Sequence, residues 1–170
     1  MLKKAIVAAA VMMGLAAAPA LAADETFVTK AAKGGMAEVQ LGKLATEKAS
    51  SAEVKKFGQR MVDDHGKAND ELKTLAQSKN ITLPTDLDPK DKALHDRLEK
   101  LSGAEFDKAY MHEMLNDHLK DVSEFRTESK SGKDADVKAW AAKTLPTLEE
   151  HLKMARDTNG AVGTSGTSKK

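Results

Sequence analysis

Four stretches of this 170-residue sequence are apolar along one helical face, and a single ionisable residue interrupts each face. The interrupting residues are Glu38, His65, His118 and His151. Except at Thr144, the other positions on these faces, which recur every three or four residues, are apolar or small. Histidine nitrogens and carboxylate oxygens are metal ligands, so four such side chains turned toward one core predict a metal site.

The make-up of this set narrows the choice of metal. Three imidazoles and one carboxylate suit iron, copper, zinc or nickel better than magnesium or calcium. A di-iron carboxylate centre would instead need two Glu-x-x-His motifs, but Val62, Leu115 and Leu148 stand three residues before the histidines. We therefore expect a transition metal ion, with Fe, Cu and Zn as candidates. Redox enzyme activity has no support without those carboxylates, and no catalytic residue is predicted.

Two other interpretations of the same residues stay open. Buried neutral histidines are normally hydrogen-bonded, so the set could belong to a structural or interaction module with an internal hydrogen-bond network and no metal. Buried histidines also titrate near neutral pH, so the protein could respond to pH. His95 and His112 lie off the apolar faces and are predicted to be surface residues.

An acidic residue precedes each of the three histidines, at Asp64, Asp117 and Glu150. A carboxylate can orient a metal-binding imidazole by accepting a hydrogen bond from its second nitrogen. The preceding residue lies about 100° round the helix, so it could serve only a histidine on a neighbouring helix. The competing expectation is that these carboxylates face solvent.

Helical periodicity predicts the elements that must position these side chains. The expected helices are Asp24–Lys48, Ser51–Asn80, a short piece at about Lys90–Leu101, Ala104–Lys130 and Asp134–Thr158. Ser50 with Glu53 predicts a capping box for the second helix. Short connections near 49–50 and 131–133 predict two antiparallel hairpins, and the connection 81–103 is long enough to cross the length of a bundle. The predicted fold is all-α, a ferritin-like four-helix bundle with one long crossover connection containing a short helix.

The two ends of the chain differ from its middle. Residues 1–22 combine the basic start MLKK, an apolar run and the small-residue ending APALA, which together are typical of a signal peptide. We expect cleavage after Ala22 and export to a bacterial periplasm. This leaves a helical bundle domain over 23–158 and a flexible Gly/Ser/Thr-rich tail over 159–170. No later apolar run approaches about 18–20 residues, so the mature chain is predicted to have no transmembrane segment.

Composition excludes several classes of protein. The chain has no cysteine, which excludes disulfides, zinc fingers, iron–sulfur clusters and covalently attached haem. It has 27 Lys and Arg against 26 Asp and Glu, and this balance argues against a nucleic-acid partner. Neither the oligomeric state nor a reaction follows from these features.

Five stretches of the chain resemble a bacterial family, domain of unknown function 4142. They are FVTKAAKGGMAEVQLGKLA, EVKKFGQRMVDDHGKANDELKTLA, LPTDL, LSGAEFDKAYMHEMLNDHLKDVSEF and VKAWAAKTLPTLEEHLKMA, within residues 24–156. The resemblance implies an exported ferritin-like bundle. The family's Asp-His pair matches Asp64 and His65, its next histidine matches His118, and its Leu-Pro…His motif ends at His151. Its members often carry the label outer membrane protein. We expect a periplasmic protein instead, because the chain lacks barrel-like alternation and a cysteine for lipid attachment. A role in metal handling or envelope stress is the functional expectation.

Overall fold

The computed structural model describes residues 18–164, and side chains within 22–163. Over that range the chain forms five helices and no strand, so the predicted all-α class is confirmed. The helices are α1 (Ala18–Lys48), α2 (Ala52–Ser78), α3 (Pro89–Glu99), α4 (Gly103–Ser131) and α5 (Ala135–Thr164). Residues 1–17 of the predicted signal peptide and 165–170 of the predicted tail lie outside the described residues. In the part of the chain that the structure describes, no helix is long and apolar enough to cross a membrane.

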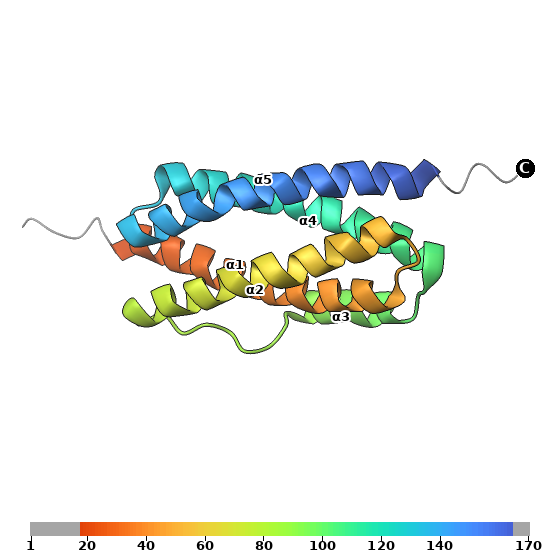
Figure 1. The fold of residues 1–170 in the computed structure, drawn as a ribbon. Coiled ribbons are helices and arrows are strands. Elements are labelled where there is room, and N and C mark those ends of the chain that lie inside the picture. The colour runs from red at the N-terminus through yellow and green to blue at the C-terminus, as the bar shows by residue number, and fades with distance from the viewer. Residues whose placement is uncertain (1–17, 165–170) are drawn as a thin grey trace, which may run out of the picture.

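The four long helices pack as two hairpins laid against each other (Figure 1). Helix α1 packs against α2 and α4 packs against α5, while the hairpins meet through contacts of α2 with α5 and of α1 with α4. The connection from α2 to α4 runs back along the bundle, so α2 and α4 point in the same direction (Figure 1). Helix α3 lies in this connection and contacts α1 and α4.

The described helix ends differ from the predicted ones in two informative places. Helix α5 continues past Thr158 to Thr164, and the side chain of Val162 is buried in the core, so the predicted end of this helix was too early. Helix α2 is capped by Ser51, whose Oγ accepts from the amide of Val54. The predicted cap, Ser50, instead donates its hydroxyl to a carboxylate on α4.

Both hairpin turns are held by a buried aspartate from the opposite hairpin. Asp107 on α4 accepts from the amides of Ser50 and Ser51, at 3.0 and 2.9 Å. Asp24 on α1 accepts from the amides of Lys133 and Asp134. Amides at a turn are costly to bury without an acceptor, so these two carboxylates help to fix how the hairpins dock.

Glycines set the spacing of α1 and α2. A Cβ atom on Gly42 would stand 2.6 Å from the carbonyl oxygen of Gly58, and one on Gly58 would stand 2.8 Å from that of Gly42. A Cβ on Gly35 would stand 2.0 Å from Asn69 Oδ1, but this atom is the end of a side chain that can move, so only Gly42 and Gly58 mark a close backbone contact. Close backbone approach along this hairpin therefore requires residues without a side chain.

The core divides into two apolar clusters. The first surrounds the α1–α2 turn and includes Phe57, Tyr110 and Met114, whereas the second surrounds the α4–α5 turn and includes Phe27 and Trp140. Along each long helix, one predicted site residue falls between members of the two clusters. The flanking pairs are Ala32 and Leu41 on α1, Met61 and Leu72 on α2, Met114 and Val122 on α4, and Leu148 and Ala155 on α5. The fold thus brings the four polar residues to one level of the bundle.

Candidate metal centre

Each of the four predicted site residues comes from a different long helix, and all four are buried. Their exposed fractions are 3% for Glu38, 7% for His65, 0% for His118 and 1% for His151. Burial of four ionisable side chains at one level of a helical core is costly unless they find polar partners or an ion. Their hydrogen bonds therefore indicate what the site can hold.

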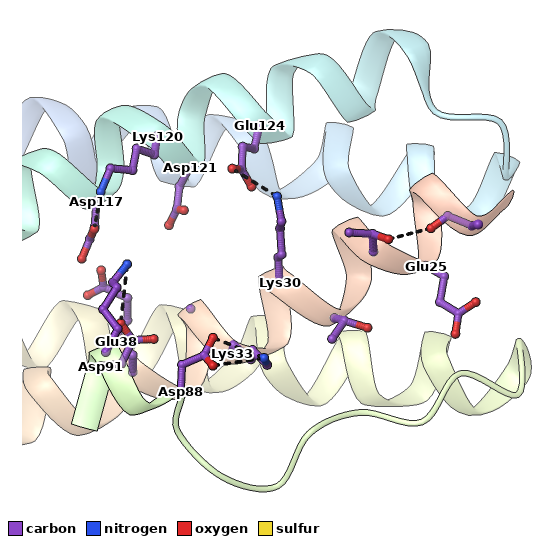
Figure 2. A pocket seen from close by; sticks show the side chains of 16 residues that line it. Glu25, Lys30, Lys33, Glu38, Asp88, Asp91, Asp117, Lys120, Asp121 and Glu124 are labelled. Atoms are coloured by element: carbon purple, nitrogen blue, oxygen red, sulfur yellow. Dashed lines mark hydrogen bonds and ion pairs between the residues drawn. The ribbon is translucent and has the colours of Figure 1, made fainter. Parts of the chain in front are cut away.

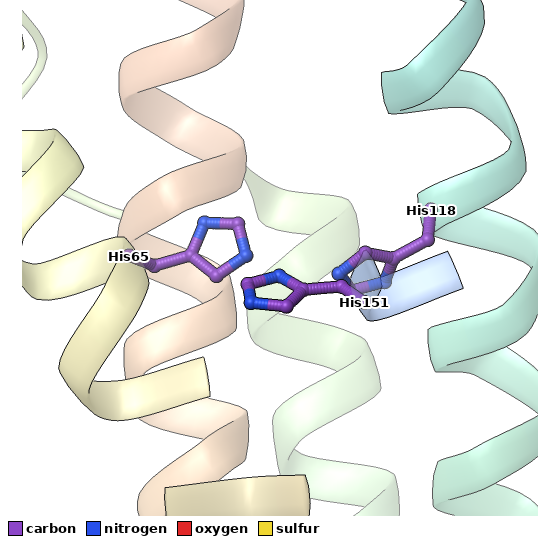
Figure 3. A group of neighbouring side chains, drawn as sticks. All are labelled: His65, His118 and His151. Carbon is purple, nitrogen blue, oxygen red and sulfur yellow. The ribbon is translucent and has the colours of Figure 1, made fainter. Parts of the chain in front are cut away.

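The three histidines converge on one point between α2, α4 and α5 (Figure 3). One nitrogen of each ring lies within 4.8 Å of one nitrogen of both other rings. The ring centroids are 5.8 Å apart for His65 and His118, 5.3 Å for His65 and His151, and 5.4 Å for His118 and His151. Nitrogens bound at about 2.0–2.1 Å to one ion would lie within about 4.2 Å of each other, close to the spacing found here.

Hydrogen bonds define which nitrogen of His118 could bind a metal. Its Nδ1 is 2.8 Å from the carbonyl oxygen of Met114. A carbonyl only accepts, so Nδ1 carries the proton and Nε2 carries the lone pair. Nε2 is buried and has no hydrogen-bond partner among the described residues.

His151 is held in the opposite tautomer. Its Nε2 is 2.8 Å from Asp64 Oδ2, and the carboxylate accepts, so the lone pair is on Nδ1. That Nδ1, like Nε2 of His65, is buried without a partner in the described part of the chain. The site therefore presents three nitrogens without partners, two of them on rings whose orientation another group has fixed. This is the arrangement that metal-binding histidines adopt.

Burial keeps the three rings neutral. Loss of solvent is the largest cause in each case: it lowers the pKa of His118 to about 4, lowers that of His65 well below its usual value, and lowers that of His151. The neighbouring rings lower the pKa of His65 further, while Asp64 opposes the shift at His151. Neutral imidazoles have lone pairs available to a metal ion at neutral pH.

Asp64 is the one preceding carboxylate that orients a histidine. As predicted, it serves a neighbouring helix, since it lies on α2 and accepts from His151 on α5. Burial opposes ionisation, yet hydrogen bonds from Arg60 and His151 lower the pKa of Asp64, so it remains a carboxylate. Arg60 also pairs with Glu150 at 3.2 Å, and Asp117 pairs with Lys120 at 3.3 Å. Those two carboxylates face cations rather than imidazoles.

Glu38 lies beside the cluster rather than within it. Its Oε1 is 3.8 Å from His118 Nδ1, the nitrogen that already donates to Met114. The lone pair of His118 is on the other nitrogen, so Glu38 approaches the ring from the side away from the predicted ion. Burial, followed by Asp121, raises the pKa of Glu38 well above its usual value. Its Oε2 has no partner among the described residues.

A surface cavity of about 130 Å³ leads to the cluster between α2 and α5. His65, His151 and Asp64 form part of its wall. Glu71 and Lys143 stand in the same wall and form an ion pair of 2.8 Å. The cavity offers small solutes a route to two of the three rings.

Three further residues bear on the sequence predictions. His112 is exposed and lies 3.1 Å from the side-chain nitrogen of Asn116, which agrees with the expected surface position. His95 is half-buried on α3, where its ring, Asp96 and Glu99 offer ligand atoms within 4.8 Å of one another. Tyr110 was not singled out by sequence, because a tyrosine on an apolar face looks like ordinary core. Its buried hydroxyl has no described partner, and burial and then Glu38 raise its pKa.

The comparisons with known proteins concern family and fold. No curated protein matches the chain. Two solved structures share its fold: a DUF305 protein from Streptomyces coelicolor and a DUF305 fragment from Deinococcus radiodurans, each with a TM-score of 0.69. They are 15% and 12% identical to this chain, cover 83% of it, and are themselves covered over 92% and 95% of their lengths. The sequence model of the family described as Domain of unknown function (DUF4142) matches residues 10–158. The chain therefore belongs to the DUF4142 family, as its motifs predicted.

Proposed function

We propose that this protein binds a transition metal ion through His65, His118 and His151, in the core of an exported ferritin-like bundle. The observation that carries the proposal is the convergence of three buried rings in the described structure: one nitrogen of each lies within 4.8 Å of one nitrogen of the others, and each ring has a buried nitrogen without a partner. Met114 and Asp64 hold the other nitrogens of two rings. Glu38 is left out of the ligand set, because it faces the nitrogen of His118 that carries the proton.

The ligand set suits Zn²⁺, Cu²⁺ or Fe²⁺, since neutral imidazoles bind all three. Three protein ligands leave one position of a tetrahedral ion for water or another ligand. The apolar clusters on both sides limit access, and the surface cavity beside His151 supplies an entry path. These features suit a role in metal handling, including metal stress in the cell envelope, and no reaction is proposed.

Export to the periplasm, after removal of residues 1–22, forms part of the proposal. The signal-peptide pattern supports it, and the Streptomyces coelicolor protein of the same fold is presumed to be secreted. Cleavage after Ala22 would retain Asp24, which accepts from the amides of the α4–α5 turn. Such cleavage would also remove the first residues of α1, which begins at Ala18. The long connection between the two hairpins supports the ferritin-like arrangement.

A metal-free structural module is the second candidate. The hydrogen bonds of His118 to Met114 and of His151 to Asp64 favour it, because both would persist without an ion. It does not account for the three nitrogens without partners, since a network would pair them.

Metal content separates the two candidates. Protein exported to a periplasm and then purified should retain close to one equivalent of metal, or take it up from Fe²⁺, Cu²⁺ or Zn²⁺ solutions. His65→Ala, His118→Ala and His151→Ala should each lose it, whereas His112→Ala, which removes an exposed histidine, should bind as wild type does. Cobalt substitution adds a direct readout, because tetrahedral Co²⁺ absorbs strongly in the visible range. A wild-type protein that binds none of these ions would leave only the structural module.

A further inference from the structure

A second cavity, of about 710 Å³, is lined in part by Glu38 (Figure 2). Its walls come from α1, from α4 and from the start of α3. Seven acidic and four basic side chains line it, so its charge is negative when all are ionised. The three-histidine proposal does not use this cavity.

The four lysines of the cavity each pair with one carboxylate. The pairs are Lys30 with Glu124 at 3.9 Å, Lys33 with Asp88 at 3.2 Å, Lys90 with Asp91 at 3.8 Å, and Lys120 with Asp117 at 3.3 Å. Glu38 and Asp121 have no ion pair with a lysine in the described structure. Glu25, the third carboxylate without a lysine partner, is exposed at the far end of the cavity. Glu38 on α1 and Asp121 on α4 line the same cavity, and Asp121 extends from α4 into it (Figure 2).

Glu38 forms the inner wall of the cavity and is only 3% exposed. Its Oε2 is buried and, among the described residues, has no hydrogen-bond partner. Among the charged groups around Glu38, Asp121 has the largest electrostatic effect on its carboxyl group. Two carboxylates that line one cavity without a cation repel each other when both are ionised, and a divalent cation bound to both removes the repulsion.

We propose that this cavity binds a divalent cation of the hard, oxygen-preferring class, such as Mn²⁺, Ca²⁺ or Mg²⁺, through the carboxylates of Glu38 and Asp121. Such ions take carboxylate and water oxygens, and the cavity has room for the waters that complete their coordination. Asp117 and Asp91 stand close enough to contribute to the electrostatics of Glu38, and add negative charge around the ion. The site lies on the proton-bearing side of the His118 ring and needs no metal at the histidines.

Titration of the full chain with Mn²⁺, followed by electron paramagnetic resonance and calorimetry, tests this site. Wild type should bind one Mn²⁺ with a Kd of about 10⁻⁴ to 10⁻³ M, the range in which extracellular modules bind Ca²⁺ through oxygen ligands. Glu38→Gln and Asp121→Asn should each weaken binding at least tenfold, an effect typical of losing one ligand oxygen pair. Both changes preserve side-chain size, and circular dichroism checks that the variants fold.

Two controls make the result specific. Glu25→Gln removes the same charge from the far end of the cavity and should change the Mn²⁺ affinity by less than about twofold, because exposed charges at that distance are screened. His65→Ala should bind Mn²⁺ as wild type does, whether or not the histidines bind a metal. Absence of saturable Mn²⁺ binding, or equal weakening by Glu25→Gln, would overturn the proposal. Loss of Mn²⁺ binding in His65→Ala but not in Glu38→Gln would place the ion at the histidines instead.

Discussion

The three-histidine cluster and the acidic cavity both lie next to Glu38, and both bury groups that would be charged in water. In the cluster, burial lowers the pKa of His118 to about 4. In the cavity, burial and then neighbouring carboxylates raise the pKa of Asp121 to about 7. Both environments favour the neutral form, but for an imidazole this means loss of a proton and for a carboxyl group it means gain of one.

The two regions therefore make stability depend on pH in opposite directions. His118 binds fewer protons when folded than when unfolded between about pH 4 and 6.5, so its contribution is lost as pH falls through that range. Asp121 binds more protons when folded between about pH 4 and 7, so its contribution is lost as pH rises. A bound cation would stabilise the buried groups of either region, but a soft or borderline ion suits the histidine nitrogens and a hard ion suits the carboxylate oxygens.

The largest expected effect is stabilisation by metal at the histidines. Zn²⁺ present at about 1,000 times its Kd should raise the free energy of unfolding of the wild type by about 4 kcal/mol. His151→Ala should lose nearly all of this gain, and Glu38→Gln should keep it, because Glu38 faces the protonated nitrogen of His118. Thermal and denaturant unfolding with and without Zn²⁺ measure the difference. An equal gain in stability in His151→Ala would show that Zn²⁺ does not stabilise the protein through the histidines.

In the metal-free protein, the loss of stability as pH falls should come from the three-histidine cluster. Between pH 6.5 and 4, burial of neutral His118 should cost the wild type on the order of 3 kcal/mol of stability, since the unfolded chain takes up the proton. His118→Gln should flatten this slope, whatever its absolute stability. Urea unfolding across the range, with a chelator present, measures the slope. An unchanged slope in the variant would show that other groups cause acid unfolding.

The loss of stability as pH rises should come from Asp121 in the acidic cavity. It should be smaller than the loss at acid pH, because Asp121 is partly exposed. Asp121→Asn should stabilise the metal-free protein at pH 8 by on the order of 2 kcal/mol, and by little at pH 4, where the native side chain is already protonated. Melting temperatures at the two pH values provide the measurement. Asp70→Asn should show no such pH dependence and serves as the matched control, because Asp70 is exposed on α2 and has no ion pair in the described structure.

The smallest effect expected concerns the carboxylate that orients His151. Asp64→Asn should weaken Zn²⁺ binding about tenfold, equal to about 1.4 kcal/mol, because the amide no longer fixes the tautomer of His151 as a charged acceptor does. Glu150→Gln removes the other acidic partner of Arg60 and should leave Zn²⁺ affinity unchanged. Competition with a chromophoric chelator measures both affinities. Similar losses in the two variants would point to Arg60 rather than to the hydrogen bond.

Much of the fold was predictable because helical periodicity and short connections are local signals. Repeated apolar positions located all four long helices, and each predicted interruption proved to be buried. Local signals failed where contacts with residues far away in the sequence determine the local structure. Ser50 looked like a helix cap but bonds Asp107, and the last turns of α5 form although their Gly-rich sequence predicted a flexible tail. Neither Asp24 nor Asp107 carries any sequence signal for the turn that it holds.

By itself the sequence determined that Glu38, His65, His118 and His151 face one core, because a helix of known period orients every side chain on it. It also limited Asp64 to serving a neighbouring helix, since adjacent residues point about 100° apart. Only the tertiary structure decided which nitrogen of each ring lacks a partner. It also decided that Glu38 lies beside the protonated nitrogen of His118. Those properties depend on ring rotation and on acceptors from other turns and helices, and the spacing of residues along one helix specifies neither.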